Sequence, residues 1–246
     1  HRATAEAQGA EEIIVGATSA SRDAENREEL VDFVRRETGL NYEIISGEDE
    51  ARWSFAAAVS AFRDLEGRCT VIDIGGGSTE IAIGDAGSGV VAQRRSLQVG
   101  SVRLTERLFS SQPPLPGEIA AAERLIESAL AEAGVELDDT IPFIGAAGTV
   151  VALALLDRGV ASWDEIGEAS VVLSADVVHA WREKLLARSF GDVLALNPDV
   201  MTGRADVFPA GVLLLDTVMR RAGIASCRVS PWGLRHGLAL RFFQKA

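Results

Sequence analysis

The residues best suited to chemistry are concentrated in residues 71–80, which read Val-Ile-Asp-Ile-Gly-Gly-Gly-Ser-Thr-Glu. Glycine tolerates positive φ angles and a close approach of other groups, so the successive N–H groups of Gly75, Gly76 and Gly77 can converge on a phosphate oxygen. The hydroxyl groups of Ser78 and Thr79 add further donors. The segment therefore predicts a phosphate-binding turn, and a plain glycine-rich hairpin is the alternative.

Two carboxylates flank this turn, Asp73 at the end of an apolar run and Glu80 after the hydroxyl residues. Both would repel a bare phosphate chain, so they predict either a Mg²⁺ ion held between them or a water molecule that they orient. Asp73 and Glu80 are thus candidate magnesium ligands, and Glu80 is also a candidate catalytic residue. A Walker-type loop is excluded because no lysine follows the glycines.

The hydrophobic periodicity on either side of the turn predicts the elements that position it. Apolar or alternating runs indicate strands, and apolar residues three and four apart indicate helices. The expected strands cover residues 13–17, 42–46, 69–74, 79–84, 90–99, 141–145 and 227–230. The expected helices cover residues 26–39, 48–62, 101–109, 116–133, 148–156, 174–186, 208–223 and 232–245.

The order of these elements predicts the fold class. From residue 69 onward, three strands of antiparallel type precede an alternation of helices and strands, which is an α/β layer architecture. A three-stranded meander followed by such an alternation is similar to a ribonuclease-H-like unit.

Composition narrows the class of partner and the compartment. A net charge of −12 argues against generic nucleic-acid binding, and no double-stranded nucleic acid is expected as a partner. The longest apolar runs are too short to cross a bilayer, so no membrane association is expected. Cys69 and Cys227 lie in apolar runs and are expected to be buried free thiols in a reducing, cytoplasmic environment.

Four segments together resemble the exopolyphosphatase/guanosine pentaphosphatase family of the sugar kinase–actin–Hsp70 superfamily. One is the Asp-Ile-Gly-Gly-Gly-Ser-Thr-Glu turn, which resembles the second phosphate-binding loop of that family. The other three read Ala-Thr-Ser-Ala-Ser-Arg-Asp-Ala-Glu-Asn (17–26), Ser-Gly-Glu-Asp-Glu-Ala-Arg (46–52), and Arg-Ala-Asp-Val-Phe-Pro-Ala-Gly (204–211) followed by Trp-Gly-Leu-Arg-His-Gly-Leu (232–238).

The resemblance implies roles for individual residues. Glu50 matches the family's catalytic base, which takes a proton from the attacking water. Arg22 matches an arginine that contacts the phosphate chain, where its planar fork suits two oxygens at once. Asp73 matches the acid linked to the metal, and the run from Gly75 to Ser78 matches the phosphate cradle. The alternatives are a solvated helix acid for Glu50 and a local ion pair with Asp23 for Arg22.

The resemblance also implies an architecture of two ribonuclease-H-like domains. Residues 1–50 would be the remainder of the first domain, with the last helix, residues 234–246, packing back on it. Residues 51–233 would form the second domain. The family's first phosphate loop, a turn of Asp-x-Gly-Ser type, does not occur in the sequence, so we expect an N-terminally truncated chain in which the first part of the first domain is missing.

The function implied is Mg²⁺-dependent hydrolysis that releases terminal orthophosphate from polyphosphate, from guanosine pentaphosphate, or from both. The enzyme is expected to be a homodimer. A kinase of the same superfamily and a nucleotide- or polyphosphate-sensing regulatory protein are the alternatives. The presence of Glu50, Asp73 and Glu80 weighs against the regulatory role. Residues 145–149, Gly-Ala-Ala-Gly-Thr, resemble the adenosine site of the superfamily, and tight strand–helix packing is the other interpretation.

Overall fold

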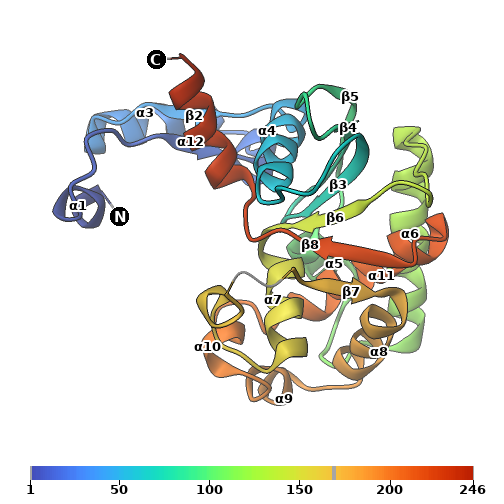
Figure 1. Ribbon diagram of the computed structural model, residues 1–246. Coiled ribbons are helices and arrows are strands. Elements are labelled where there is room, and N and C mark those ends of the chain that lie inside the picture. Colours follow the sequence, from blue (N-terminus) through green and yellow to red (C-terminus); the bar gives the residue numbers. More distant parts are fainter. Residues whose placement is uncertain (1, 168–169, 246) are drawn as a thin grey trace.

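The computed structural model describes residues 2–167 and 170–245 and has a small and a large lobe (Figure 1). The small lobe contains two parallel strands, β1 (Val15–Ala17) and β2 (Tyr42–Ile44), with the helices α1 (Arg2–Ala7), α2 (Ser19–Asp23) and α3 (Arg27–Thr38). The large lobe is built on a six-stranded sheet. Within the described residues, no helix combines the length and the apolar character that crossing a bilayer requires.

The strands of the large sheet follow the order β5-β4-β3-β6-β8-β7. A meander of antiparallel strands, β3 to β5, forms one side, and β6 and then β8 continue the sheet in parallel with β3. This arrangement agrees with the predicted ribonuclease-H-like unit. The strands are β3 (Arg68–Ile74), β4 (Thr79–Asp85), β5 (Val91–Leu97), β6 (Phe143–Ala146), β7 (Val172–Ser174) and β8 (Ser226–Val229).

The short edge strand β7, antiparallel to β8, was not expected from the sequence. It has only three residues, too few to show an alternating pattern, and Leu173 is the buried one among them. The short helices α2, α9 (Phe190–Leu194) and α10 (Pro198–Met201) escaped prediction for the same reason.

Both faces of the sheet are covered, which explains the nearly continuous apolar runs of its central strands. Side chains such as Ile72 and Ile74 lie in the larger hydrophobic core. That core includes residues of α5 (Ser101–Leu108), α6 (Pro116–Ala133), α7 (Ala147–Arg158), α8 (Ala175–Leu186) and α11 (Phe208–Ala222). Val71 and Ala82 point to the opposite face, where Phe55 and Ala58 of α4 (Gly47–Ser60) cover them.

The last helix, α12 (Leu234–Lys245), crosses from the large lobe to the small one (Figure 1). Gly16 on β1 leaves no room for a side chain, since a Cβ there would lie 2.7 Å from Cδ1 of Leu238. Arg241 forms an ion pair with Glu43 on β2 at 2.8 Å, and Gly237 lies against the backbone of Trp53 on α4. These contacts join both lobes through α12, while the domain boundaries at residues 50 and 233 stay a prediction.

Candidate active site

Three polar side chains form a row across the large sheet. Asp73 on β3 is the direct partner of Glu80 on β4, and Glu80 is the direct partner of Ser96 on β5. Direct partners in an antiparallel ladder point to the same face with their Cβ atoms close together. The register of the strands therefore brings the two carboxylates predicted from the glycine-rich segment side by side, on the face covered by α4.

Helix α4 lies over this row. Its N-cap is Ser46, whose hydroxyl accepts from the backbone N–H of Asp49 at 3.1 Å, a typical way to satisfy a helix start. The next residue, Gly47, packs so closely on Ser96 that any Cβ would collide with that side chain. Two turns later, the Ser54 hydroxyl donates to Oδ2 of Asp73 at 2.5 Å. The helix is thus held at both ends of the row.

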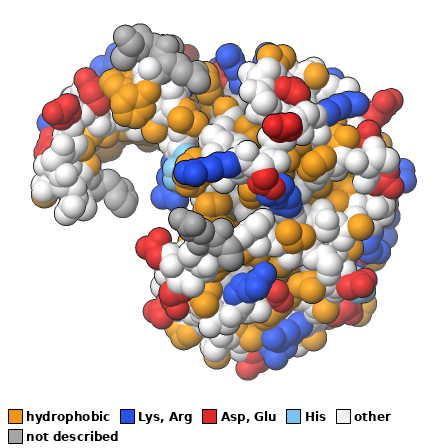
Figure 2. All heavy atoms as spheres, viewed as in Figure 1, with side chains coloured by type: hydrophobic (Ala, Val, Ile, Leu, Met, Phe, Trp, Pro, Cys, Tyr) orange, Lys and Arg blue, Asp and Glu red, His pale blue; other side chains and the backbone are white. Residues whose placement is uncertain are grey.

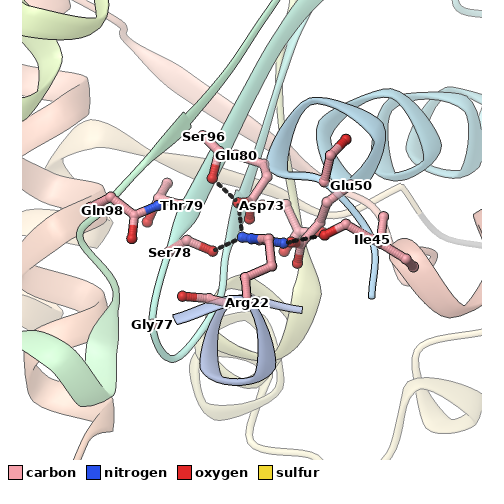
Figure 3. Close-up of polar contacts among 12 residues, drawn as sticks. Arg22, Ile45, Glu50, Asp73, Gly77, Ser78, Thr79, Glu80, Ser96 and Gln98 are labelled. Carbon is pink, nitrogen blue, oxygen red and sulfur yellow. Dashed lines mark hydrogen bonds and ion pairs between the residues drawn. The ribbon is translucent and has the colours of Figure 1, made fainter. Parts of the chain in front are cut away.

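Glu50 lies on α4 between these two contacts and is buried, with 8% of its surface exposed. Its Oε2 accepts a hydrogen bond from Nη1 of Arg22 at 2.6 Å (Figure 3). Burial raises the pKa of Glu50, and the bond and charge of Arg22 oppose that shift. Glu50 is therefore not a solvated helix acid. Glu48, two residues earlier, is exposed and pairs with Arg94 at 3.0 Å.

The two carboxylate oxygens of Glu80 have different surroundings. Ser96 donates to its Oε1 at 2.7 Å, while its buried Oε2 has no hydrogen-bond partner among the described residues. Burial raises the pKa of Glu80 to about 8, and the nearby charges of Glu50 and Asp73 add to the effect. Burial also raises the pKa of Asp73. Because three acids lie close together and one oxygen of Glu80 has no partner among the described residues, the site favours the binding of a cation or of a proton.

The acids present fit a magnesium ion, although they do not enclose one. In the part of the chain that the structure describes, no three acidic, histidine or cysteine side chains are grouped to hold a metal by themselves. Magnesium commonly takes one or two carboxylates and completes its shell with water and substrate oxygens. Asp73 and Glu80 match that pattern, because they are adjacent and Glu80 Oε2 is unpaired.

The turn between β3 and β4 presents backbone donors to one side. The carbonyls of Gly75, Gly76 and Gly77 accept hydrogen bonds from the N–H of Ser101, the N–H of Arg103 and Nε of Arg103, at 3.0, 3.0 and 2.7 Å. In a planar trans peptide the N–H points opposite to the C=O, so the N–H groups of residues 76–78 point away from α5. Among the described residues none of these three has an acceptor, which leaves three donors for phosphate oxygens.

The expected reason for the glycines was partly wrong. None of Gly75, Gly76 and Gly77 has a positive φ angle; they are required because neighbouring groups come close. A Cβ on Gly77 would lie 2.6 Å from Oγ of Ser19, and one on Gly76 would lie 3.0 Å from Val102. Gly100, which sequence reasoning missed, is needed as well, since its Cβ would lie 2.5 Å from the Gly76 carbonyl oxygen.

Arg22 connects the small lobe to this turn. Its Nη1 also donates to the Ile45 carbonyl at 2.8 Å, and its Nη2 donates to the Ser78 hydroxyl at 3.5 Å and lies 3.9 Å from Oε1 of Glu80 (Figure 3). The alternative of a local ion pair with Asp23 does not hold, because Asp23 pairs with Arg103. The structure therefore gathers Arg22, Glu50, Ser78 and the two acids of the row.

Thr79 does not join this group. Its buried hydroxyl donates to the Val99 carbonyl at 2.7 Å. Alternation along β4 places it on the sheet face opposite to that of Glu80. The expectation that the Thr79 hydroxyl would reach a phosphate is therefore not met, and Thr79 supports the turn from behind.

A pocket of about 410 Å³ opens beside Glu50 and Asp73, and the space-filling view shows a hollow between the two lobes (Figure 2). Sequence reasoning assigned no role to Arg204, Arg235 and His236, which line it. They lie in segments that had already resembled the family, which was the available signal. Val151, Leu155 and Val200 supply an apolar wall.

The backbone at the start of α7 borders this pocket. Ala147 adopts a positive φ angle of 67°, the single described residue other than glycine to do so, and both Ala147 and Gly148 line the pocket. Strained backbone of this kind is common at ligand sites. Tight strand–helix packing is also present here, since a Cβ on Gly145 would lie 2.6 Å from Val150.

Comparison with known proteins identifies the family of the chain. The sequence model of the Ppx/GppA phosphatase family matches residues 3–246. Exopolyphosphatase 2 of Mycobacterium tuberculosis is 35% identical over 245 residues, covering 94% of this chain and 75% of its own. Exopolyphosphatase 1 of the same species is 31% identical over 242 residues, covering 95% of this chain and 67% of its own.

Solved structures of the family share the fold. The Ppx/GppA family member of Aquifex aeolicus superposes with a TM-score of 0.82 at 29% identity, covering 99% of this chain and 78% of its own. An exopolyphosphatase-like protein gives a TM-score of 0.89 at 30% identity, with 99% and 81% coverage. The predicted fold class, that of the sugar kinase–actin–Hsp70 superfamily, is confirmed. Together with the match along almost all of the sequence, these likenesses show that the chain belongs to the Ppx/GppA phosphatase family.

Proposed function

We propose that this protein hydrolyses the terminal phosphoanhydride bond of inorganic polyphosphate and releases orthophosphate in a Mg²⁺-dependent reaction. The observation that carries the proposal is the position of Glu50. This buried carboxylate with a raised pKa is connected through Arg22 to Ser78 of the turn, and it lies close enough to Asp73 and Glu80 for their charges to interact. The relatives named exopolyphosphatase point to polyphosphate as the substrate.

In the proposed reaction, the free N–H groups of residues 76–78 and the Ser78 hydroxyl hold oxygens of the terminal phosphate. Glu50 accepts a proton from a water molecule whose oxygen attacks the phosphorus, and the bond to the bridging oxygen breaks, leaving a chain shorter by one phosphate. A magnesium ion, held by Asp73 and Glu80, would neutralise charge on the phosphate oxygens.

Arg22 would exchange partners during this reaction. Without substrate, its guanidinium group is held by Glu50 and by the Ile45 carbonyl. A phosphate bound at the turn offers the same group two anionic oxygens in a geometry that suits its planar fork. Arg22 would then contact the phosphate and release Glu50 to accept the proton.

Guanosine pentaphosphate is the second candidate substrate. The pocket beside Glu50 has an apolar wall of Val151, Leu155 and Val200, with Arg204 and Arg235 close by. An unmodified phosphate chain does not require apolar contacts, whereas a nucleoside does. Activity on this substrate would add guanosine pentaphosphate phosphohydrolase to the enzyme's functions.

The decisive experiment compares Glu50→Gln with Glu48→Gln. Glutamine keeps the size of the side chain but cannot accept the proton, so Glu50→Gln should lower turnover by roughly 10²–10⁴-fold. Glu48 is exposed on the same helix and should be silent. Orthophosphate release is measured from polyphosphate and from guanosine pentaphosphate. If Glu50→Gln hydrolyses both like the parent, the base is misassigned and a kinase or a regulatory role gains ground.

A further inference from the structure

We propose that Arg103 is the positioning residue of the phosphate-binding turn, and that it also fixes the helix that carries Arg22. It orients the amide donors of the turn by bonding to the carbonyl groups on the opposite side of the turn, and it does not bind the substrate. The expected effect on catalysis rests on the proposed function, whereas the positioning of the turn and of α2 can be tested without measuring activity.

Arg103 binds the turn twice. Its backbone N–H donates to the Gly76 carbonyl at 3.0 Å, and its side-chain Nε donates to the Gly77 carbonyl at 2.7 Å. The second bond fixes the peptide plane between Gly77 and Ser78, and the N–H of Ser78 must then point the other way. The side chain of Arg103 thus determines the direction of one of the three donors assigned to phosphate.

The same guanidinium group reaches across to the small lobe. Its Nη2 donates to the carboxylate of Asp23 and to Oγ of Ser19 at 3.2 Å, both on the five-residue helix α2. Asp23 follows Arg22 directly in sequence, so the residue that binds Glu50 is held from its neighbour. Gly77 completes the junction, since it packs on Ser19 with no room for a Cβ.

These contacts indicate that Arg103 acts by positioning the turn and α2, and that it does not contact the substrate directly. Nε and Nη2 are occupied by the turn, by Asp23, by Ser19 and by Gln98. The carboxylate of Asp23 already balances the charge of Arg103. Lysine could replace only part of this arrangement, because its single ammonium group cannot donate in two fixed directions as a guanidinium fork does.

The expected defect is therefore in binding. A turn whose amide donors are misdirected holds the phosphate less well in the ground state and in the transition state alike, which raises KM more than it lowers kcat. Arg103→Met should raise KM for polyphosphate about tenfold or more, in line with the loss of charged hydrogen bonds. Arg103→Lys should fall between Arg103→Met and the parent.

A double-mutant cycle identifies the route of the effect. Asp23→Asn is combined with Arg103→Met, and KM and kcat are measured for all four proteins. If Arg103 acts through Asp23 and the turn, the effects are coupled and the double variant is less impaired than the product of the single effects. Fully multiplicative effects on KM would overturn the coupling through α2. Arg107→Met is the matched control, because Arg107 is exposed on α5 and its side chain makes no hydrogen bond or ion pair with the residues that the structure describes.

A second measurement does not depend on activity. Amide hydrogen exchange should quicken at Gly75 and Ser101, whose N–H groups donate to Ser78 and Gly75 of the turn, and in α2 of Arg103→Met, and remain unchanged in both places in Arg107→Met. Unaltered exchange at both places would overturn the inference, whatever the kinetics. If instead exchange responds but the parent releases no orthophosphate from either substrate, the positioning role stands and the proposed function fails.

Discussion

The Ser54 hydroxyl donates to Oδ2 of Asp73, so one turn of α4 beyond Glu50 the helix is joined to the acid that ends β3. Both groups are almost fully buried. This bond fixes the rotation of α4 over the sheet and thereby the direction in which Glu50 points. It also stabilises the charged form of Asp73 against the burial that raises its pKa.

Ser54→Ala should remove that support. The variant should lose about 1.5–3 kcal/mol of unfolding free energy, the value typical of a hydrogen bond to a charged group. It should also need a higher Mg²⁺ concentration for half-maximal phosphate release, because Asp73 becomes harder to ionise. Urea unfolding and magnesium titration measure the two effects. Ser60→Ala, near the far end of the same helix, is the control and should alter neither.

Gly47 and Ser96 provide a test of how α4 is seated on the sheet. Gly47→Ala places a methyl group against the Ser96 side chain and should cost about 1–3 kcal/mol, as overpacking usually does. Ser96→Gly should relieve the clash in the double variant, whereas Ser96→Ala keeps the Cβ and should not. The cost of Gly47→Ala is therefore measured in the Ser96→Gly and in the Ser96→Ala background. An equal cost in both backgrounds would show that α4 shifts freely to make room for the methyl group.

The crowded acids predict an unusual dependence of stability on pH. Folding raises the pKa of Glu80 from 4.5 to about 8, so between these values the folded chain keeps a proton that the unfolded chain loses. Without metal, the contribution of Glu80 to stability should be fully present below pH 4.5 and be lost as the pH rises to about 8, by at most about 1.4 kcal/mol per pH unit. Glu80→Gln should flatten the curve of unfolding free energy against pH, measured in chelator. An unchanged slope would mean that Glu80 is ionised in the folded chain.

Arg22→Met should shift the pH dependence of turnover. Arg22 lowers the pKa of Glu50 against the effect of burial, so its removal raises that pKa. A base must be ionised to accept a proton, and kcat/KM reports the free enzyme, in which Arg22 holds Glu50. The acid limb of the kcat/KM profile should therefore move to higher pH. Arg94→Met removes an arginine whose ion pair, among the described residues, is with exposed Glu48, and it should leave the limb in place. A shift in Arg94→Met of the same size would point to a general charge effect.

Local sequence patterns predicted much of the fold because most elements are long enough to show their period. Helix α6 was expected at residues 116–133 and occurs there, with proline in its first turn and Gly134 in the left-handed conformation after its end. Among the elements that escaped prediction, β7 and α2 have three and five residues. Their existence depends on contacts with distant segments, which a short window does not contain.

The residues of the candidate site likewise divide into those that the sequence could predict and those that it could not. Asp73, Glu80 and the glycine turn could be recognised from residue types alone, since they lie in one segment. Arg103 could not, because its role depends on the meeting of α5 with the turn and with Asp23, 80 positions earlier. Thr79 illustrates the opposite error. Its residue type suggested a phosphate donor, but strand alternation turns its hydroxyl to the other face.

The arrangement of α4 determines how the charged groups of the site are divided between the two lobes. Glu50, Asp73, Glu80 and Ser96 move as one block, because Ser54 and Gly47 attach the helix to the sheet. Arg22 belongs to α2 in the small lobe. The acids of the site are thus fixed to one lobe, while the arginine that bonds Glu50 comes from the other. The distance between these opposite charges, and with it the counter-charge offered to a polyanion, depends on how the two lobes are held against each other.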